Sequence, residues 1–313
     1  MAAATHNTIS TGKDIAHERS APCAPPSPVY HPAFSAAADI MLESSDGTLY
    51  RIDLYTLRAT SGFFNTMLSL PAPEGGHKAE PIPLHAPDDA VEPLLRLMCG
   101  MYTHPWRTLD EIEAVLQLAE NWDTPGPIAY LRTALDAPKW RTADPIRLYA
   151  LATHFTWRAE AQRASTAALA LDLFAPEHAD ALARLPAPAL VALLRLHRAR
   201  RDVLRALLDS PDGFLAGNGE PFHCSACAFT PLDNRSWRAL KIRLVREIER
   251  APAGEALGVL VGGMAEWPET RACWDAKCSR PECGAANYDR IATLKQIRSC
   301  VNALPVAVDL DWD

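Results

Sequence analysis

The residues whose types and spacing best support chemistry are cysteines near the C-terminal end of the sequence. Cys224-Ser-Ala-Cys227 forms a CxxC motif, and Cys273, Cys278 and Cys283 follow further along the chain at Cx4C spacing. Tetrahedral zinc takes four thiolate or imidazole ligands, which commonly come as two closely spaced pairs. The sequence therefore predicts a structural zinc site, in which four protein ligands leave no position for a water nucleophile.

Two further residues, Cys273 and His223, could also serve as zinc ligands. Pro281 and Gly284 suit the tight turn that the second pair needs, whereas Cys273 follows a predicted helix. Cys273 and His223 remain possible substitutes, and buried free thiols are the alternative to any metal, because cysteine is among the most buried residue types. The predicted ligands are Cys224, Cys227, Cys278 and Cys283.

The segment between the cysteine pairs contains a predicted amphipathic helix near residues 236–250. Its apolar stripe consists of Trp237, Leu240, Leu244 and Ile248. The basic residues outside this stripe are Arg235, Arg238, Lys241 and Arg246. Basic residues beside a metal site can contact nucleic acid, but they also keep an ordinary helix soluble. We expect the solvated face and treat nucleic acid as an unlikely partner.

No catalytic constellation is recognisable in the sequence. A cysteine hydrolase needs a histidine base within reach of the thiol, whereas His154 and His197 lie on apolar helical stripes typical of hydrogen-bonded structural histidines. Paired carboxylates such as Asp88-Asp89 occupy predicted helix starts, where they complement the helix dipole. We therefore expect a protein that is not an enzyme.

Composition indicates the class and compartment of the chain. A length of 313 residues allows two or three domains with a sizeable core. The formal net charge of −7 opposes non-specific nucleic-acid binding. Eight cysteines are too few for a disulfide scaffold in a chain of this length, and the short-spaced sets among the five between Cys224 and Cys283 suggest metal binding in a reducing compartment. Without an apolar run of about 20 residues or a signal-peptide pattern, we expect cytoplasmic or nuclear localisation and no membrane partner.

The segment 38–70 carries the clearest structural pattern. Ile40 and Leu42 alternate with polar or exposed positions, as do Tyr50 and Ile52, which predicts two strands with one buried face. Matching these faces requires Leu42 to oppose Tyr50 and Ile40 to oppose Ile52. A three-residue loop, 45–47, achieves this register, with Gly47 in the left-handed conformation after a type I turn.

Helix starts are predicted from capping residues along the same half of the chain. Asp53, Ser61 and Asp88 are each expected to cap a following helix. Thr108 and Glu111 form a predicted capping box for a helix through residue 119. A short strand is expected at 82–84.

These patterns resemble the BTB/POZ domain in the divergent form abundant in fungi. The resemblance is carried by Ala38-Asp39-Ile40, the Ser45-Asp46-Gly47 turn, the Leu57-x3-Ser61-x-Phe63-Phe64 run and Met67. It extends to the segments LLRLMCGMY and LDEIEAVLQLAENWD. One departure is Asp53, because the family usually carries a histidine just after the second strand.

The predicted fold is α+β and mostly helical, in four segments. Residues 1–33 are rich in Ala, Ser, Thr and Pro and are expected to be a disordered tail. Residues 34–136 form the BTB/POZ-like domain, with a small sheet and helices, and 139–212 form a helical extension that resembles the BACK region. Residues 218–313 form the cysteine-rich helical module with its predicted zinc.

The resemblance implies protein–protein interaction without catalysis. It implies either a self-associating homodimeric scaffold or a substrate adaptor for a cullin-type ubiquitin ligase. The alternative is a BTB-containing transcriptional regulator that uses the cysteine module to contact nucleic acid. The fungal proteins of this type often carry a C-terminal cysteine pair, in keeping with the predicted zinc.

Overall fold

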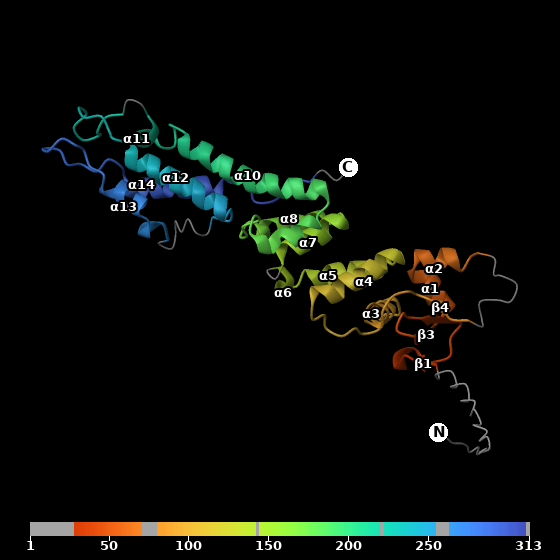
Figure 1. Ribbon diagram of the computed structural model, residues 1–313. Coiled ribbons are helices and arrows are strands. Elements are labelled where there is room, and N and C mark those ends of the chain that lie inside the picture. Colours follow the sequence, from red (N-terminus) through yellow and green to blue (C-terminus); the bar gives the residue numbers. More distant parts are fainter. Residues whose placement is uncertain (1–27, 71–79, 142–143, 220–221, 255–262, 311–313) are drawn as a thin grey trace, which may run out of the picture. The chain divides into compact units, whose positions relative to one another are not determined.

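A computed structural model describes residues 28–70, 80–141, 144–219, 222–254 and 263–310. The chain divides into two compact units, Met1–Leu131 and Arg132–Asp313. Helices dominate both, and the described residues contain a single four-stranded sheet (Figure 1). The predicted α+β, mostly helical class is therefore confirmed.

The sheet lies in the first unit and has the strand order β1-β3-β2-β4. Its strands are β1 (Val29–Tyr30), β2 (Ile40–Glu43), β3 (Thr48–Ile52) and β4 (Ile82–Pro83). β2 and β3 pair antiparallel, with Leu42 opposite Tyr50 and Ile40 opposite Ile52. The N–H of Gly47 donates to the carbonyl of Ser44 (3.1 Å), and Gly47 has a φ of 81°. The predicted register, loop length and left-handed glycine are all confirmed.

Five helices pack with this sheet or follow it. They are α1 (Leu54–Thr60), α2 (Gly62–Met67), α3 (Asp88–Met98), α4 (Leu109–Asn121) and α5 (Pro125–Leu135), the last of which crosses the boundary between the units. The inward side chains of β2 and β3 and of α1–α4 are buried. Among the largest fully buried ones are Leu42, Tyr50, Leu57, Phe64, Leu94, Leu95, Ile112 and Leu116.

Two of the predicted helix caps are confirmed. The Ser61 hydroxyl accepts a hydrogen bond from the N–H of Phe64 (3.1 Å). The Thr108 hydroxyl accepts from the N–H of Glu111 (3.2 Å). The Glu111 carboxylate reaches back to the N–H of Arg107 (2.8 Å) rather than to that of Thr108, so the reciprocal half of the capping box is displaced by one residue.

The other two predicted caps are wrong in their side-chain roles. Asp53 occupies the N-cap position of α1, but its side chain makes no capping bond, and the carboxylate of Asp39 accepts from the N–H of Leu54 instead (3.3 Å). α3 begins at Asp88 itself, and its N–H donates to the carboxylate of Asp46 (2.7 Å). In both cases a carboxylate distant in sequence replaces the local one.

The predicted disordered tail is also corrected at its C-terminal end. Val29–Tyr30 forms β1, parallel to β3, and Pro32–Phe34 forms a 3₁₀ helix whose Phe34 is buried. The Pro-rich composition concealed this segment because a two-residue edge strand has no detectable period. The prediction for residues 1–27 lies outside the described residues.

The Asp88 side chain joins the hairpin to the start of α3. Its carboxylate accepts from the hydroxyls of Thr48 (2.6 Å) and Tyr50 (2.8 Å). Tyr50 is fully buried, and His31 stacks on its ring with a centroid separation of 5.1 Å. The hydrogen bond to Asp88 offsets the cost of removing the Tyr50 hydroxyl from water.

We expect Asp88→Ala to lower the local opening free energy of β3 and α3 at pH 7 by about 1–3 kcal/mol, because it leaves the buried Tyr50 hydroxyl unpaired. Hydrogen exchange of the full-length protein measures this. Asp89→Ala, at the neighbouring exposed position, is the matched control and should change little. Equal effects of the two substitutions would contradict the role of the Asp88 hydrogen bonds.

The stability difference between wild type and Asp88→Ala should depend on pH. Burial raises the pKa of Asp88, but hydrogen bonds from Ser44, Thr48 and Tyr50 outweigh burial and hold the pKa below its ordinary value of 3.8. A lowered folded-state pKa contributes stability above the ordinary pKa and loses it as pH falls through the folded-state pKa. The gap between wild type and Asp88→Ala should therefore shrink below about pH 4.

The second unit is entirely helical among its described elements. Its longer helices are α7 (Pro145–His154), α8 (Arg158–Ala168), α10 (Ala187–Asp209), α12 (Arg235–Arg250), α13 (Pro268–Asp275) and α14 (Arg290–Asn302). Shorter elements are α6 (Pro138–Arg141), α9 (Ala179–Ala183), α11 (Leu215–Asn218) and the 3₁₀ turns Pro176–His178 and Gly263–Glu266. α10 packs on α12 and α14, so the predicted helical extension and cysteine module both contribute helices to this unit.

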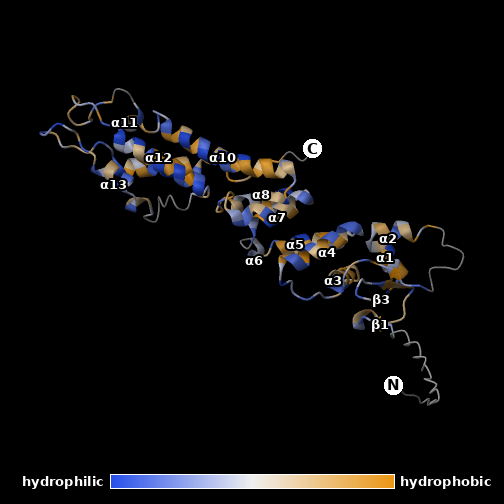
Figure 2. Ribbon diagram, viewed as in Figure 1, coloured by the Kyte–Doolittle hydropathy of each residue, from blue (hydrophilic) through white to orange (hydrophobic). Residues whose placement is uncertain are grey.

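The core between α10, α12 and α14 is built from amphipathic faces. Figure 2 shows hydrophilic and hydrophobic patches alternating along α10 and α12. Trp237 is at the centre, 1% exposed, and its indole N–H donates to Asn218 (2.9 Å). A Cβ at Gly217 would lie 2.4 Å from the indole ring, so only glycine permits this approach. The cluster comprises Leu204, Leu208, Phe214, Trp237, Leu240, Leu244, Ile248, Met264, Cys273, Tyr288, Ile297, Cys300 and Leu304.

Arg200 is a buried cation in α10 that the sequence pattern did not reveal. It is 4% exposed, and its guanidinium donates to the carbonyls of Pro252 (2.6 Å), Ala253 (3.5 Å) and Pro305. These carbonyls belong to the turn after α12 and to the segment after α14. A single side chain thus joins three parts of the chain by charge-assisted hydrogen bonds.

We expect Arg200→Met to destabilise the segment 303–310 by about 3 kcal/mol, because hydrogen bonds from a charged donor are lost within the interior. Hydrogen exchange of that segment in the full-length protein measures the change. Arg205→Met on the same helix is the control. The Arg205 side chain is 74% exposed and lies 4.0 Å from Asp209, so its loss should cost less than about 1 kcal/mol. Similar losses in both variants would contradict the proposed role of Arg200.

Candidate metal centre

The two cysteine pairs lie on two short hairpin-like turns. In the first turn, His223 and Pro231 form an isolated bridge, and the N–H of Cys224 donates to the carbonyl of Thr230 (2.8 Å). Ala228 closes this turn with a φ of 58°, an uncommon conformation for a residue with a Cβ. The backbone therefore folds tightly enough to bring Cys224 and Cys227 to the same side.

The second turn repeats this construction. Lys277 and Ala286 form an isolated bridge, and the N–H of Cys278 donates to the carbonyl of Ala285 (2.8 Å). The N–H of Cys283 donates to the carbonyl of Arg280 (3.0 Å), and Gly284 takes a φ of 57°. Gly284 thus supplies the tight turn that the sequence predicted for it.

The four sulfur atoms of Cys224, Cys227, Cys278 and Cys283 lie within 4.8 Å of one another. The Cys224–Cys283 sulfur distance is 3.7 Å, and the Cys227–Cys278 distance is 3.8 Å. A zinc–sulfur bond of about 2.3 Å implies an edge of about 3.8 Å in a regular tetrahedron. The arrangement therefore has the ligand type, number and spacing of a site that could bind a metal ion.

Hydrogen bonds and crowding act differently on the individual thiols. The N–H of Phe229, followed by the side chain and N–H of Thr230, lowers the pKa of Cys227 to about 6. The pKa of Cys283 is raised to about 11, because burial and the neighbouring thiols outweigh the N–H of Ala285. Four adjacent thiolates repel one another, so a bound cation is needed to keep all of them ionised.

The two substitutes that the sequence left open are placed elsewhere. Cys273 is fully buried within the hydrophobic cluster of α12, α13 and α14, and burial raises its pKa to about 12. His223 is adjacent to Cys224 but is exposed and does not join the group of four. The residues brought together are those predicted from the CxxC and Cx4C spacing.

Two of the four basic residues predicted outside the apolar stripe of α12 are paired with acidic residues. Arg235 pairs with Asp233 (3.0 Å), and Lys241 pairs with Asp209 (2.5 Å). Arg243, on the same helix, pairs with the buried Glu247 (3.2 Å). These ion pairs reduce the positive potential of α12.

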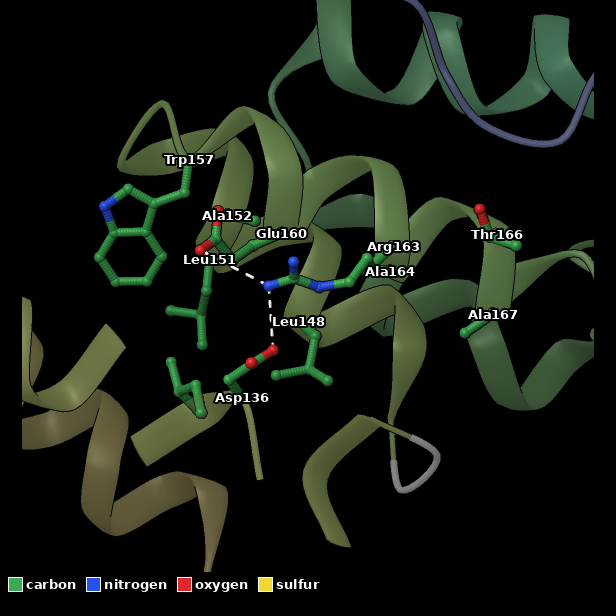
Figure 3. A pocket seen from close by; sticks show the side chains of 11 residues that line it. Asp136, Leu148, Leu151, Ala152, Trp157, Glu160, Arg163, Ala164, Thr166 and Ala167 are labelled. Carbon is green, nitrogen blue, oxygen red and sulfur yellow. Dashed lines mark ion pairs between the residues drawn. The ribbon is translucent and has the colours of Figure 1, made fainter. Parts of the chain in front are cut away.

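The second unit also contains an apolar cavity of about 270 Å³. Figure 3 shows Arg163 spanning the carboxylates of Asp136 (2.9 Å) and Glu160 (3.6 Å) beside apolar side chains. Glu160 is also held by Arg132 (2.8 Å). The lining contains no serine, cysteine or histidine, and both of its carboxylates are held in these ion pairs. The lining is Leu135, Asp136, Leu148, Leu151, Ala152, Trp157, Glu160, Arg163, Ala164, Thr166 and Ala167.

His197 differs from its predicted role as a hydrogen-bonded histidine. Its Nε2 is buried and has no hydrogen-bond partner among the described residues. Burial, followed by the charge of Arg200, lowers the pKa of His197 to about 4, so the imidazole is neutral at pH 7. A neutral ring tolerates this environment better than a charged one.

Comparisons with protein-family models and with curated proteins find no match to this sequence. Within the described part of the chain, no helix has both the length and the apolarity needed to cross a membrane.

Substitutions of Cys283 and Cys273 test which cysteines bind the metal. We expect Cys283→Ser to weaken binding of cobalt(II), a spectroscopic substitute for zinc, by on the order of 100-fold. The binding free energy of a structural zinc site is about 10–16 kcal/mol, so each of four ligands contributes roughly 3 kcal/mol. Cys273→Ala should leave the thiolate-to-cobalt absorption intact, since its sulfur belongs to the core. Titration of each variant with cobalt(II) measures both effects, and loss of the absorption in Cys273→Ala would exclude the assigned ligand set.

Proposed function

We propose that this protein is a non-catalytic protein-interaction protein of BTB/POZ type whose C-terminal unit is stabilised by a structural zinc ion. The observation that carries the metal assignment is the group of four sulfurs at about tetrahedral spacing. Cys224, Cys227, Cys278 and Cys283 would supply all four ligands, so zinc would act as a cross-link between two turns. Zinc is favoured over iron or copper as the metal that most often fills structural thiolate sites.

The proposal that the protein is non-catalytic is supported by the interactions of its candidate catalytic groups, the four thiols and the carboxylates at the cavity. A closed site with four thiolates provides no open coordination position for substrate. The carboxylates at the apolar cavity are engaged in ion pairs with Arg163 and Arg132. Neither arrangement presents a nucleophile together with a base, which hydrolytic chemistry requires.

The BTB/POZ part is supported by the N-terminal unit. Its hairpin has the register expected from the residues that carry the resemblance, and two short helices follow β3. We propose two forms of interaction, a self-associating scaffold or an adaptor for a cullin-type ubiquitin ligase. A transcriptional regulator that contacts nucleic acid through α12 is disfavoured by the ion pairs of Arg235 and Lys241.

Native mass spectrometry of full-length protein from a metal-replete preparation tests the zinc assignment. One zinc per chain is expected, and chelation should increase hydrogen exchange in the turns 222–231 and 277–286, because metal binding is linked to folding of its ligand segments. Exchange in α3 and α4 of the first unit provides the internal control. Protein without zinc, or with unchanged exchange after chelation, would refute a structural metal.

The same spectra and a purification distinguish the two forms of interaction. A dimer mass without a co-purifying cullin supports the scaffold, and a stoichiometric cullin complex supports the adaptor. A monomer that recovers no partner protein from its own cell extract would count against both.

A further inference from the structure

Within the group of four sulfurs, two close contacts each join one turn to the other. Cys224 lies 3.7 Å from Cys283, and Cys227 lies 3.8 Å from Cys278, measured between sulfur atoms. In each pair one thiol is buried, Cys224 or Cys278, and the other is partly exposed, Cys283 or Cys227. Each pair thus joins a partly exposed cysteine to a buried cysteine.

We propose that the metal centre is a peroxide-responsive modification site, in which oxidation replaces the zinc cross-link by the disulfides Cys224–Cys283 and Cys227–Cys278. The metal-releasing part of this inference rests on the proposed zinc site, whereas the disulfide pairing rests on the sulfur positions alone. The oxidised protein would keep the two turns joined covalently after the metal is lost.

The chemistry uses hydrogen peroxide as the oxidant. The partly exposed thiolate attacks a peroxide oxygen, so that an S–O bond forms and the O–O bond breaks, giving a sulfenic acid and water after uptake of one proton. The buried thiolate then attacks the sulfenic sulfur, an S–S bond forms, and hydroxide leaves as water with a second proton. Each pair loses two electrons and reduces one peroxide to two waters, so two peroxides oxidise the whole site.

The backbone of the two turns favours pairing between them. Each turn is closed by its own hydrogen bonds, from Cys224 to Thr230 and from Cys278 to Ala285, so neither needs to open for the facing sulfurs to approach. Within the same unit, Cys273 and Cys300 are buried in the core, which keeps their thiols from competing.

The test is peptide mapping of full-length, zinc-loaded protein treated with hydrogen peroxide and then alkylated without reduction. We expect zinc release together with peptides that link residue 224 to 283 and 227 to 278, assigned by fragmentation between Cys224 and Cys227. Reduction followed by added zinc should restore one zinc per chain. The oxidised form should keep lower hydrogen exchange in both turns than protein that is reduced and metal-stripped.

Two matched variants check the pairing. Cys283→Ser should form Cys227–Cys278 alone, and Cys278→Ser should form Cys224–Cys283 alone, while Cys99→Ser should behave as wild type. If the Cys283→Ser or Cys278→Ser variant misfolds, the peptide map of the oxidised wild-type protein alone tests the disulfide pairing. Disulfides within a turn, oxidation only to sulfinic acid, or intact thiols after excess peroxide would each overturn the inference.

The outcomes also separate this inference from the proposed function. Zinc-loaded protein that forms no disulfide between the turns refutes the inference and leaves the zinc site standing. Protein that contains no zinc but forms both predicted disulfides refutes the zinc site and supports the pairing.

Discussion

Four cysteine sulfurs within 4.8 Å of one another impose the strongest constraint on the C-terminal unit. Their residues are separated by 51 to 59 positions across the two close pairs, and α12 and α13 lie between them. Closing such a loop costs chain entropy that packing alone must otherwise offset. Mutual repulsion prevents the four thiols from ionising together unless a cation is bound. Geometry and charge therefore both favour a metal, and the helices between the turns are the part of the fold that a metal would stabilise.

Sequence pattern predicted the features whose causes are local. The β2–β3 register follows from the alternation around Leu42 and Tyr50 combined with the only loop length that matches their faces. The Ser61 and Thr108 caps depend on residues three positions apart. The cysteine set could be predicted because metal-ligand spacing within each turn is itself a short-range pattern.

The features that could not be predicted depend on partners distant in sequence. Asp88 was expected to cap its own helix, but the carboxylate of Asp46 takes that role and leaves Asp88 to the hydroxyls of Thr48 and Tyr50. Arg200 resembles the exposed arginines around it, and only its carbonyl partners after α12 and α14 identify it as buried. Composition and periodicity contain no information on such pairings, because they describe one segment at a time.

The core beside the metal centre has a second connection between the same two segments. The hydroxyl of Tyr288, which follows the second turn, donates to Asn234 at the N-cap of α12 (2.9 Å). Both residues are buried, and the ring of Tyr288 lies 6.3 Å from that of Trp237. The chain segments that leave the two cysteine turns are therefore joined again where they enter the helical core. Because this contact and the apolar cluster involve none of the four clustered cysteines, the helical core holds together independently of any metal at the turns. The cysteine group and the core are thus two separate connections between the same chain segments, and only the first would respond to metal or to oxidation.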